Sequence, residues 1–169
     1  LSRRQRQMCI RDRLWRAEQE GIFQPVDSAV LSERIPAHLR HPEGEWFGLS
    51  KRARVIAHKK DMALPAGFGT YEALANEAFR GKVCMRSSGN IYNLSLMASL
   101  IDAHGVEAAE AWAKGVVANF ARTPQSNDTG QLKAVASGEC TITIANTYYL
   151  GRLMASTKAS PFHPAGHMM

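Results

Sequence analysis

Apolar residues along the chain recur with two periods, one typical of helices and one typical of strands. Leu94, Met97 and Ile101 recur at helical spacing, which indicates a helix that ends before a glycine. The same reading, with Thr70 as a possible cap for the second helix, predicts helices over residues 14–20, 71–79, 91–104, 106–120, 129–136 and 148–154.

Three short apolar runs predict strands at residues 54–58, 82–86 and 141–145. Strands that alternate with helices over short loops predict an α/β fold with a mainly parallel sheet flanked by helices. Ligands of such sheets bind beyond the carboxyl ends of the strands. Polar turns are expected there at residues 87–90, 126–128 and 146–149.

The formal charge of +6 suggests an anionic partner, but much of it lies in the first thirteen residues. Residues 3–13 (RRQRQMCIRDR) match, in one frame, the translation of a transposase-based sequencing adapter whose last codon is one base short. We therefore interpret residues 1–13 as adapter-derived and not native. Without their five arginines and one aspartate the charge falls to +2. No nucleic-acid partner is then expected.

Tyrosine is the scarce residue type with chemical interest. Tyr71 is expected in the first turn of an exposed helix, whereas Tyr92, Tyr148 and Tyr149 fall near strand ends. A phenol has a pKa near ~10, so it becomes a metal ligand only when a strongly acidic cation displaces its proton. Ferric iron is the common cation of that kind. The alternative for a Tyr-Tyr pair is aromatic packing at a strand end.

Several segments together are similar to the ferric-iron-binding periplasmic proteins of iron ABC transporters, in the branch that uses several tyrosines. They are Trp46-Phe47-Gly48-Leu49-Ser50-Lys51-Arg52, Arg86-Ser87-Ser88-Gly89-Asn90-Ile91-Tyr92-Asn93, Pro124-Gln125-Ser126-Asn127-Asp128 and Asn146-Thr147-Tyr148-Tyr149-Leu150-Gly151-Arg152. Residues 14–40 match as well, so the resemblance covers nearly all of the chain after residue 13.

The resemblance implies part of a type II periplasmic-binding-protein fold, with iron between two lobes. Residues 14–50 would end the N-lobe, 51–58 would be a crossover strand, and 59–156 would form most of the C-lobe. The family's iron-binding tyrosines fall on Tyr92, Tyr148 and Tyr149. A further ligand of the N-lobe would lie upstream of residue 14, so the chain is expected to be a fragment. Residues 157–169 are expected to be a doubtful tail.

Other residues receive expected roles by their position in the resemblance. Arg52 and Arg152 would offset phenolate charge, or form ordinary ion pairs. Asn127 and Asn146 would orient ligands or an anion, although asparagine also caps helices. Ser87, Ser88 and Gly89 precede a helix, so their amides could receive an anion.

Cys84 and Cys140 lie in or beside two strands that could be neighbours. In an oxidising compartment they could form a disulfide, and otherwise they would be small buried residues. The six histidines show no clear metal-ligand spacing on a helix, and we expect none of them to be functional.

The resulting expectation is the Fe(3+)-binding component of an ABC importer. It would be a monomer in the periplasm that delivers iron to an inner-membrane permease and catalyses no reaction. Two alternatives remain: the same fold binding another anion or small molecule, and an α/β enzyme that uses Cys84 or a histidine. The sequence offers no nucleophile elbow or phosphate loop for the enzyme.

Overall fold

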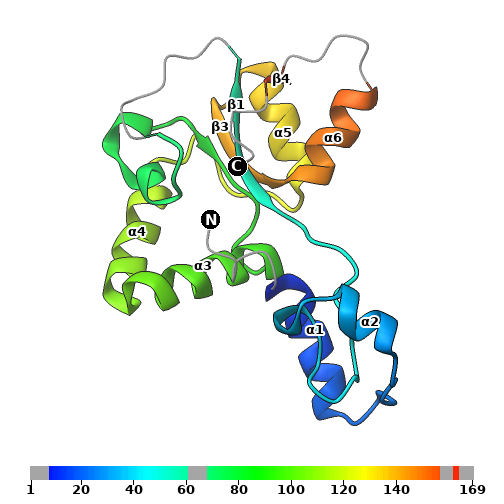
Figure 1. Ribbon diagram of the computed structural model, residues 1–169. Coiled ribbons are helices and arrows are strands. Elements are labelled where there is room, and N and C mark those ends of the chain that lie inside the picture. The colour runs from blue at the N-terminus through cyan, green and yellow to red at the C-terminus, as the bar shows by residue number, and fades with distance from the viewer. Residues whose placement is uncertain (1–7, 61–67, 157–161, 164–169) are drawn as a thin grey trace. The chain divides into compact units, whose positions relative to one another are not determined.

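The computed structural model describes residues 8–60, 68–156 and 162–163, with side chains for residues 14–60 and 68–156. It divides into two compact units, residues 1–52 and 53–169. Figure 1 shows the course of the chain.

The first unit contains α1 (Met8–Gln19), α2 (Ala29–Arg34) and the short 3-10 helix η1 (Ala37–Leu39). Ser28 caps α2, because its Oγ accepts a hydrogen bond from the Leu31 amide. The helix predicted at residues 14–20 begins earlier, inside the segment interpreted as adapter-derived. Methionine, isoleucine and arginine in that segment are adequate helix formers.

The second unit is built on a four-stranded sheet in the order β2-β3-β1-β4. Its strands are β1 (Arg54–Lys59), β2 (Val83–Cys84), β3 (Ile142–Asn146) and β4 (Phe162–His163). The helices are α3 (Ile91–His104), α4 (Val106–Ala118), α5 (Asp128–Ser137) and α6 (Thr147–Ser156). The α/β class is therefore confirmed.

Helices cover both faces of this sheet, with α3 and α4 on one side and α5 and α6 on the other (Figure 1). All five residues of β3 are buried. Ile142 and Ile144 belong to the core with α3 and α4, and Ala145 belongs to the core with α5 and α6. Alternate residues of one strand thus feed two cores, as the period of two requires.

The expected mainly parallel sheet is wrong in the described strands. Only β2 and β3 pair in parallel, whereas β1 pairs antiparallel with both β3 and β4. The alternation of strands and helices predicts parallel pairing only for β2 and β3, which are joined through α3, α4 and α5. It does not predict the direction in which β1 pairs, because no α-helix joins β1 to β2 in the described part of the chain. Arg54 at the start of β1 consequently lies opposite Asn146 at the end of β3.

The helix expected at residues 71–79 is also wrong. Two 3-10 helices replace it, η2 (Glu72–Ala75) and η3 (Glu77–Phe79). Thr70 is not the cap residue of η2, although its hydroxyl oxygen accepts a hydrogen bond from the Ala73 amide at 3.3 Å. Between them Asn76 is extended. The buried Asn119 side chain donates to the carbonyls of Leu74 and Asn76 at 2.9 and 2.7 Å, which gives these carbonyls partners outside a helix.

Of the doubtful tail, only the residues of β4 are described, and they pair with His58 and Lys59 at the edge of the sheet. The rest of residues 157–169 lies outside the described residues.

Cys84 and Cys140 form a disulfide, one of the two alternatives that the sequence left open. It joins β2 to the residue two before β3, with 5.8 Å between the Cα atoms, and both cysteines are buried. The bond closes a loop across 56 positions of sequence.

We expect loss of this disulfide to destabilise the second unit, because a cross-link restricts the unfolded chain. Replacing both cysteines by alanine should lower the free energy of unfolding by about 2–5 kcal/mol, measured by urea denaturation. Dithiothreitol should destabilise the parent chain and leave the double variant unchanged. Equal stability of the oxidised parent and the double variant would contradict this role.

Candidate metal centre

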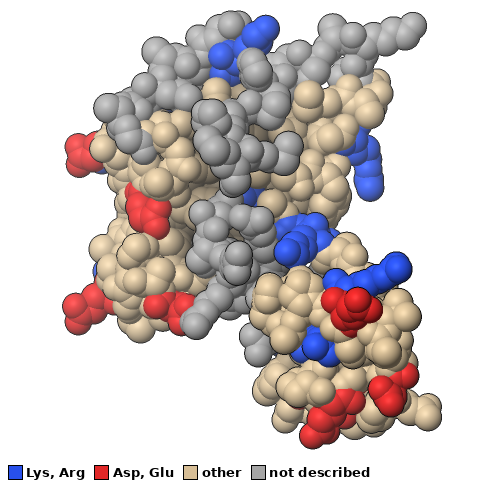
Figure 2. Space-filling view, in the orientation of Figure 1, with Lys and Arg blue, Asp and Glu red and all other residues tan. Residues whose placement is uncertain are grey.

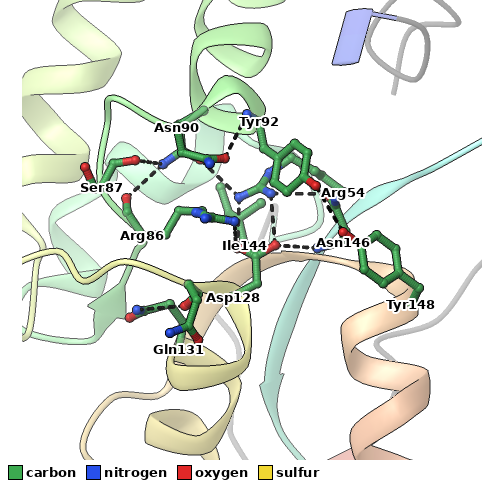
Figure 3. A network of polar contacts seen from close by, with 12 residues as sticks. Arg54, Arg86, Ser87, Asn90, Tyr92, Asp128, Gln131, Ile144, Asn146 and Tyr148 are labelled. Carbon is green, nitrogen blue, oxygen red and sulfur yellow. Dashed lines mark hydrogen bonds and ion pairs between the residues drawn. The ribbon is translucent and has the colours of Figure 1, made fainter. Parts of the chain in front are cut away.

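Three tyrosines from two elements converge at one end of the sheet. Tyr92 lies in the first turn of α3, and Tyr148 and Tyr149 begin α6 directly after β3. The hydroxyl oxygens of Tyr92 and Tyr148 are 3.1 Å apart (Figure 3), and the rings of Tyr148 and Tyr149 lie 4.2 Å apart between centroids. The structure thus brings together all three tyrosines that the sequence singled out as iron ligands.

Local capping fixes the direction of the first tyrosine. The Asn90 side chain caps α3 by accepting from the Tyr92 amide at 3.0 Å. On the other side, the Thr147 amide donates to the Ala53 carbonyl at 2.9 Å and fastens the start of α6 to the start of β1. Each tyrosine therefore follows a backbone segment with defined hydrogen bonds.

The phenols influence one another. A hydrogen bond with Tyr148 and partial burial raise the pKa of the Tyr149 phenol above its ordinary value. The charges of Tyr148 and Asp128 add to this rise in pKa, and that of Arg86 opposes it. The Tyr149 phenol is thus neutral at ordinary pH. A metal cation must therefore displace its proton before the oxygen can bind the metal as a phenolate.

A buried carboxylate lies next to these tyrosines. Asp128, the first residue of α5, is fully buried and accepts hydrogen bonds at 3.2 Å from Arg54 and from Arg86, one on each oxygen. The oxygen that Arg54 contacts also accepts from the Asn146 amide at 3.1 Å. One side chain therefore joins the start of β1, the segment after β2, the end of β3 and the start of α5 (Figure 3).

The two arginines extend this network to the remaining turns. Arg54 also donates to Asn93, Asn146 and the Ile144 carbonyl, at 3.0, 3.2 and 3.2 Å. Arg86 also donates to the Ser126 carbonyl at 2.7 Å. Both guanidinium groups lie near the ring of Tyr92, 5.5 and 5.2 Å from its centroid.

Sequence reasoning missed Arg54, Arg86 and Asp128 as parts of the site. Arg86 follows β2, so its position at the carboxyl edge of the sheet could have been inferred. Arg54 begins β1, and only the antiparallel pairing brings it to that edge. The sequence did contain a signal for both arginines. Each lies at one terminus of an apolar strand, where a charged side chain close to the core needs a partner of opposite charge.

The two arginines selected by resemblance are both exposed. Arg152 is exposed on α6, and Arg52 is an exposed residue of the first unit. Their expected effect on phenolate charge stays a prediction.

The selected polar residues have mainly local partners. Asn127 caps α5, because its side-chain oxygen accepts from the Gly130 amide at 2.6 Å. Asn146 is buried and belongs to the arginine network, and its side-chain nitrogen has no hydrogen-bond partner among the described residues. Ser88 is exposed in the turn before α3. Roles for these three in orienting a ligand or an anion stay predictions.

Tyr71 is not on an exposed helix, as the sequence suggested. Its side chain is buried, and its hydroxyl donates to the Arg54 carbonyl at 2.8 Å. The indole of Trp112 donates to the Tyr71 carbonyl at 2.6 Å. These contacts draw the ring inward because the helix expected around it does not form.

One histidine lies in a polar cluster of the first unit. Among the described residues, Glu18, His41 and Glu45 place one potential ligand atom each within 4.8 Å of one another. Neighbouring residues of the first unit already bind two members of the cluster. The Trp46 indole donates to Glu18, and the Glu43 amide donates to Nδ1 of His41. The second ring nitrogen of His41 faces Glu18 at 3.5 Å. The expectation that His41 has no functional role stays a prediction.

On the face in Figure 2, the described residues of the first unit show basic and acidic side chains side by side. In the part of the chain that the structure describes, no helix is long and apolar enough to cross a membrane.

Residues 8–166 match the sequence profile of a family described as bacterial extracellular solute-binding proteins. The chain belongs to this family. Iron uptake protein A1 of Synechocystis is 57% identical over 144 residues, which are 85% of this chain and 40% of that protein. A solved Trichodesmium protein (IdiA, FutA), in complex with iron and citrate, has 57% identity and a TM-score of 0.78. The match covers 86% of this chain and 46% of that one.

A structure of ferric iron-binding protein A from Mannheimia haemolytica, in an open conformation, gives 43% identity and a TM-score of 0.77 over 85% of this chain and 46% of that one. These likenesses confirm a partial type II periplasmic-binding-protein fold. The chain spans somewhat less than half the length of the relatives it matches.

We expect Asp128→Asn to destabilise the fold strongly, because two buried arginines would lose their shared counter-charge. Removing one partner of a buried ion pair costs about 3–5 kcal/mol, which urea unfolding of the metal-free protein would measure. Glu139→Gln is the matched control, since it breaks the more exposed pair with Arg122 and should cost at most about 1 kcal/mol. Equal losses in the two variants would show that Asp128 has no special role.

Proposed function

We propose that this solute-binding chain is part of the Fe(3+)-binding component of an iron importer, with Tyr92, Tyr148 and Tyr149 as phenolate ligands. The observation that carries the proposal is the 3.1 Å contact between the hydroxyl oxygens of Tyr92 and Tyr148, with the Tyr149 ring stacked beside it. Oxygen donors at this spacing suit one small hard cation.

The relatives support the choice of ion. One is named for iron uptake, one was solved with iron and citrate, and one is a ferric iron-binding protein. The alternative, another anion or small molecule in the same fold, gives no reason for three phenols at one point.

The second alternative, an α/β enzyme, is disfavoured by the state of its nucleophile. Cys84 is fully buried and bonded to Cys140, so it offers no thiolate. The chain belongs to a solute-binding family. The proposal accordingly includes no catalytic step.

Three further parts of the proposal concern the parent protein. The extracellular family and the disulfide support a periplasmic location. The division between Arg52 and Ala53 falls within the proposed crossover 51–58, which supports an N-lobe part at 14–50 and a C-lobe part at 59–156. Delivery as a monomer to an inner-membrane ABC permease follows from the family resemblance alone.

The ligands can be tested by colour in a chain completed to the length of its relatives. Phenolate-to-iron charge transfer should give the ferric protein an orange to red absorption band. Replacing Tyr148 and Tyr149 together by phenylalanine should abolish the band, because two of the three proposed ligand oxygens are removed while the rings remain.

Tyr71→Phe is the matched control, since Tyr71 is the tyrosine of this sequence that is not proposed as a ligand, and its loss should keep the band. A colourless parent protein after ferric loading would refute iron binding. A band that survives the double replacement would refute this ligand assignment.

A further inference from the structure

The cluster of Arg54, Arg86 and Asp128 carries more positive than negative charge in a buried place. Two guanidinium groups share one carboxylate, so the cluster has a formal charge of +1. The side chains are 8%, 10% and 0% exposed, in that order. Buried charges are normally paired, because the interior solvates them poorly.

The hydrogen-bond partners leave this excess charge in place. Apart from Asp128, the hydrogen-bond acceptors described for the two arginines are neutral amide and carbonyl oxygens. The Nε atoms of both arginines are buried and have no hydrogen-bond partner among the described residues. The cluster therefore stabilises an anion placed next to it.

The group that faces this cluster is the ring of Tyr92. Both guanidinium carbons lie within 5.5 Å of its centroid, one at 5.5 and one at 5.2 Å. Arg54 also holds Asn93, the next residue of α3, at 3.0 Å. The same arginine bonds to Asn146, two residues before Tyr148. The cluster thus contacts one ligand directly and the backbone next to another.

We propose that Arg54, Arg86 and Asp128 form a positively charged seat for the Tyr92 phenolate, with the arginines as positioning residues that also set the donor strength of that ligand. This inference rests on the proposed function. When iron converts the Tyr92 phenol to phenolate, its negative charge compensates the excess charge of the seat. The seat favours the bound state electrostatically and holds the ring in place for it.

The test uses Arg86, because Arg54 bonds to four groups and its loss would disturb more of the fold. In the chain completed to the length of its relatives, Arg86→Met and Arg86→Gln remove the charge, and Arg86→Lys keeps it. Gln retains a hydrogen-bond donor and covers the case in which the Met variant does not fold. Arg122→Met is the control, since Arg122 pairs with Glu139 and Gln131 instead.

The measurements are the position of the charge-transfer band and the ferric affinity in competition with citrate. A neighbouring cation lowers the energy of phenolate electrons, so both neutral variants should move the band to longer wavelength. Their affinity should fall about 10–100-fold, as is usual for residues behind a metal ligand. Arg86→Lys should restore the parent band and most of the affinity, and Arg122→Met should change neither.

A band that stays in place in the neutral variants would overturn the electrostatic role, whatever the affinity. A lysine variant as impaired as the glutamine variant would also overturn it, because geometry and not charge would then matter. A parent protein without any band would refute the proposed function itself and this inference with it.

Discussion

The hydrogen bonds of the Asp128 carboxylate hold together the end of the second unit that carries the three tyrosines. It is fully buried, and it accepts from two arginines and from the backbone amide of Asn146. Through these bonds it connects the start of β1, the end of β2, the end of β3 and the start of α5. Without it, two arginines would remain in the interior with no described carboxylate partner, at a cost of about 3–5 kcal/mol.

The two cores explain why this end of the sheet is firmly packed. Helices α3 and α4 pack against one face and α5 and α6 against the other, so β3 is buried on both sides. The disulfide from Cys84 to Cys140 fixes β2 near the start of β3. The helices that carry Tyr92 and Tyr148 therefore follow strands that have little freedom to move.

Sequence alone could supply the fold class and the three tyrosines, because helical and strand periods are local and tyrosine is rare. It could not supply the network behind Tyr92. Arg54 reaches that place only through the antiparallel pairing of β1, which depends on strand order and not on any local pattern. The helix expected at 71–79 failed for a similar reason, since Asn119, distant in sequence, bonds to the carbonyls where it breaks.

Because β3 is buried on both faces, mutations in its core residues could change the position of Tyr148, which follows the strand. Ile142 and Ile144 face one core while Ala145 faces the other, so a slip of one residue would exchange large and small side chains between two filled spaces. Such a slip would also carry Tyr148 along by about 3.3 Å. Metal–ligand distances tolerate only about 0.2 Å. The packing of Ile142 and Ile144 thus fixes the register of β3. The smallest change of register would move Tyr148 much further than the proposed metal centre could tolerate.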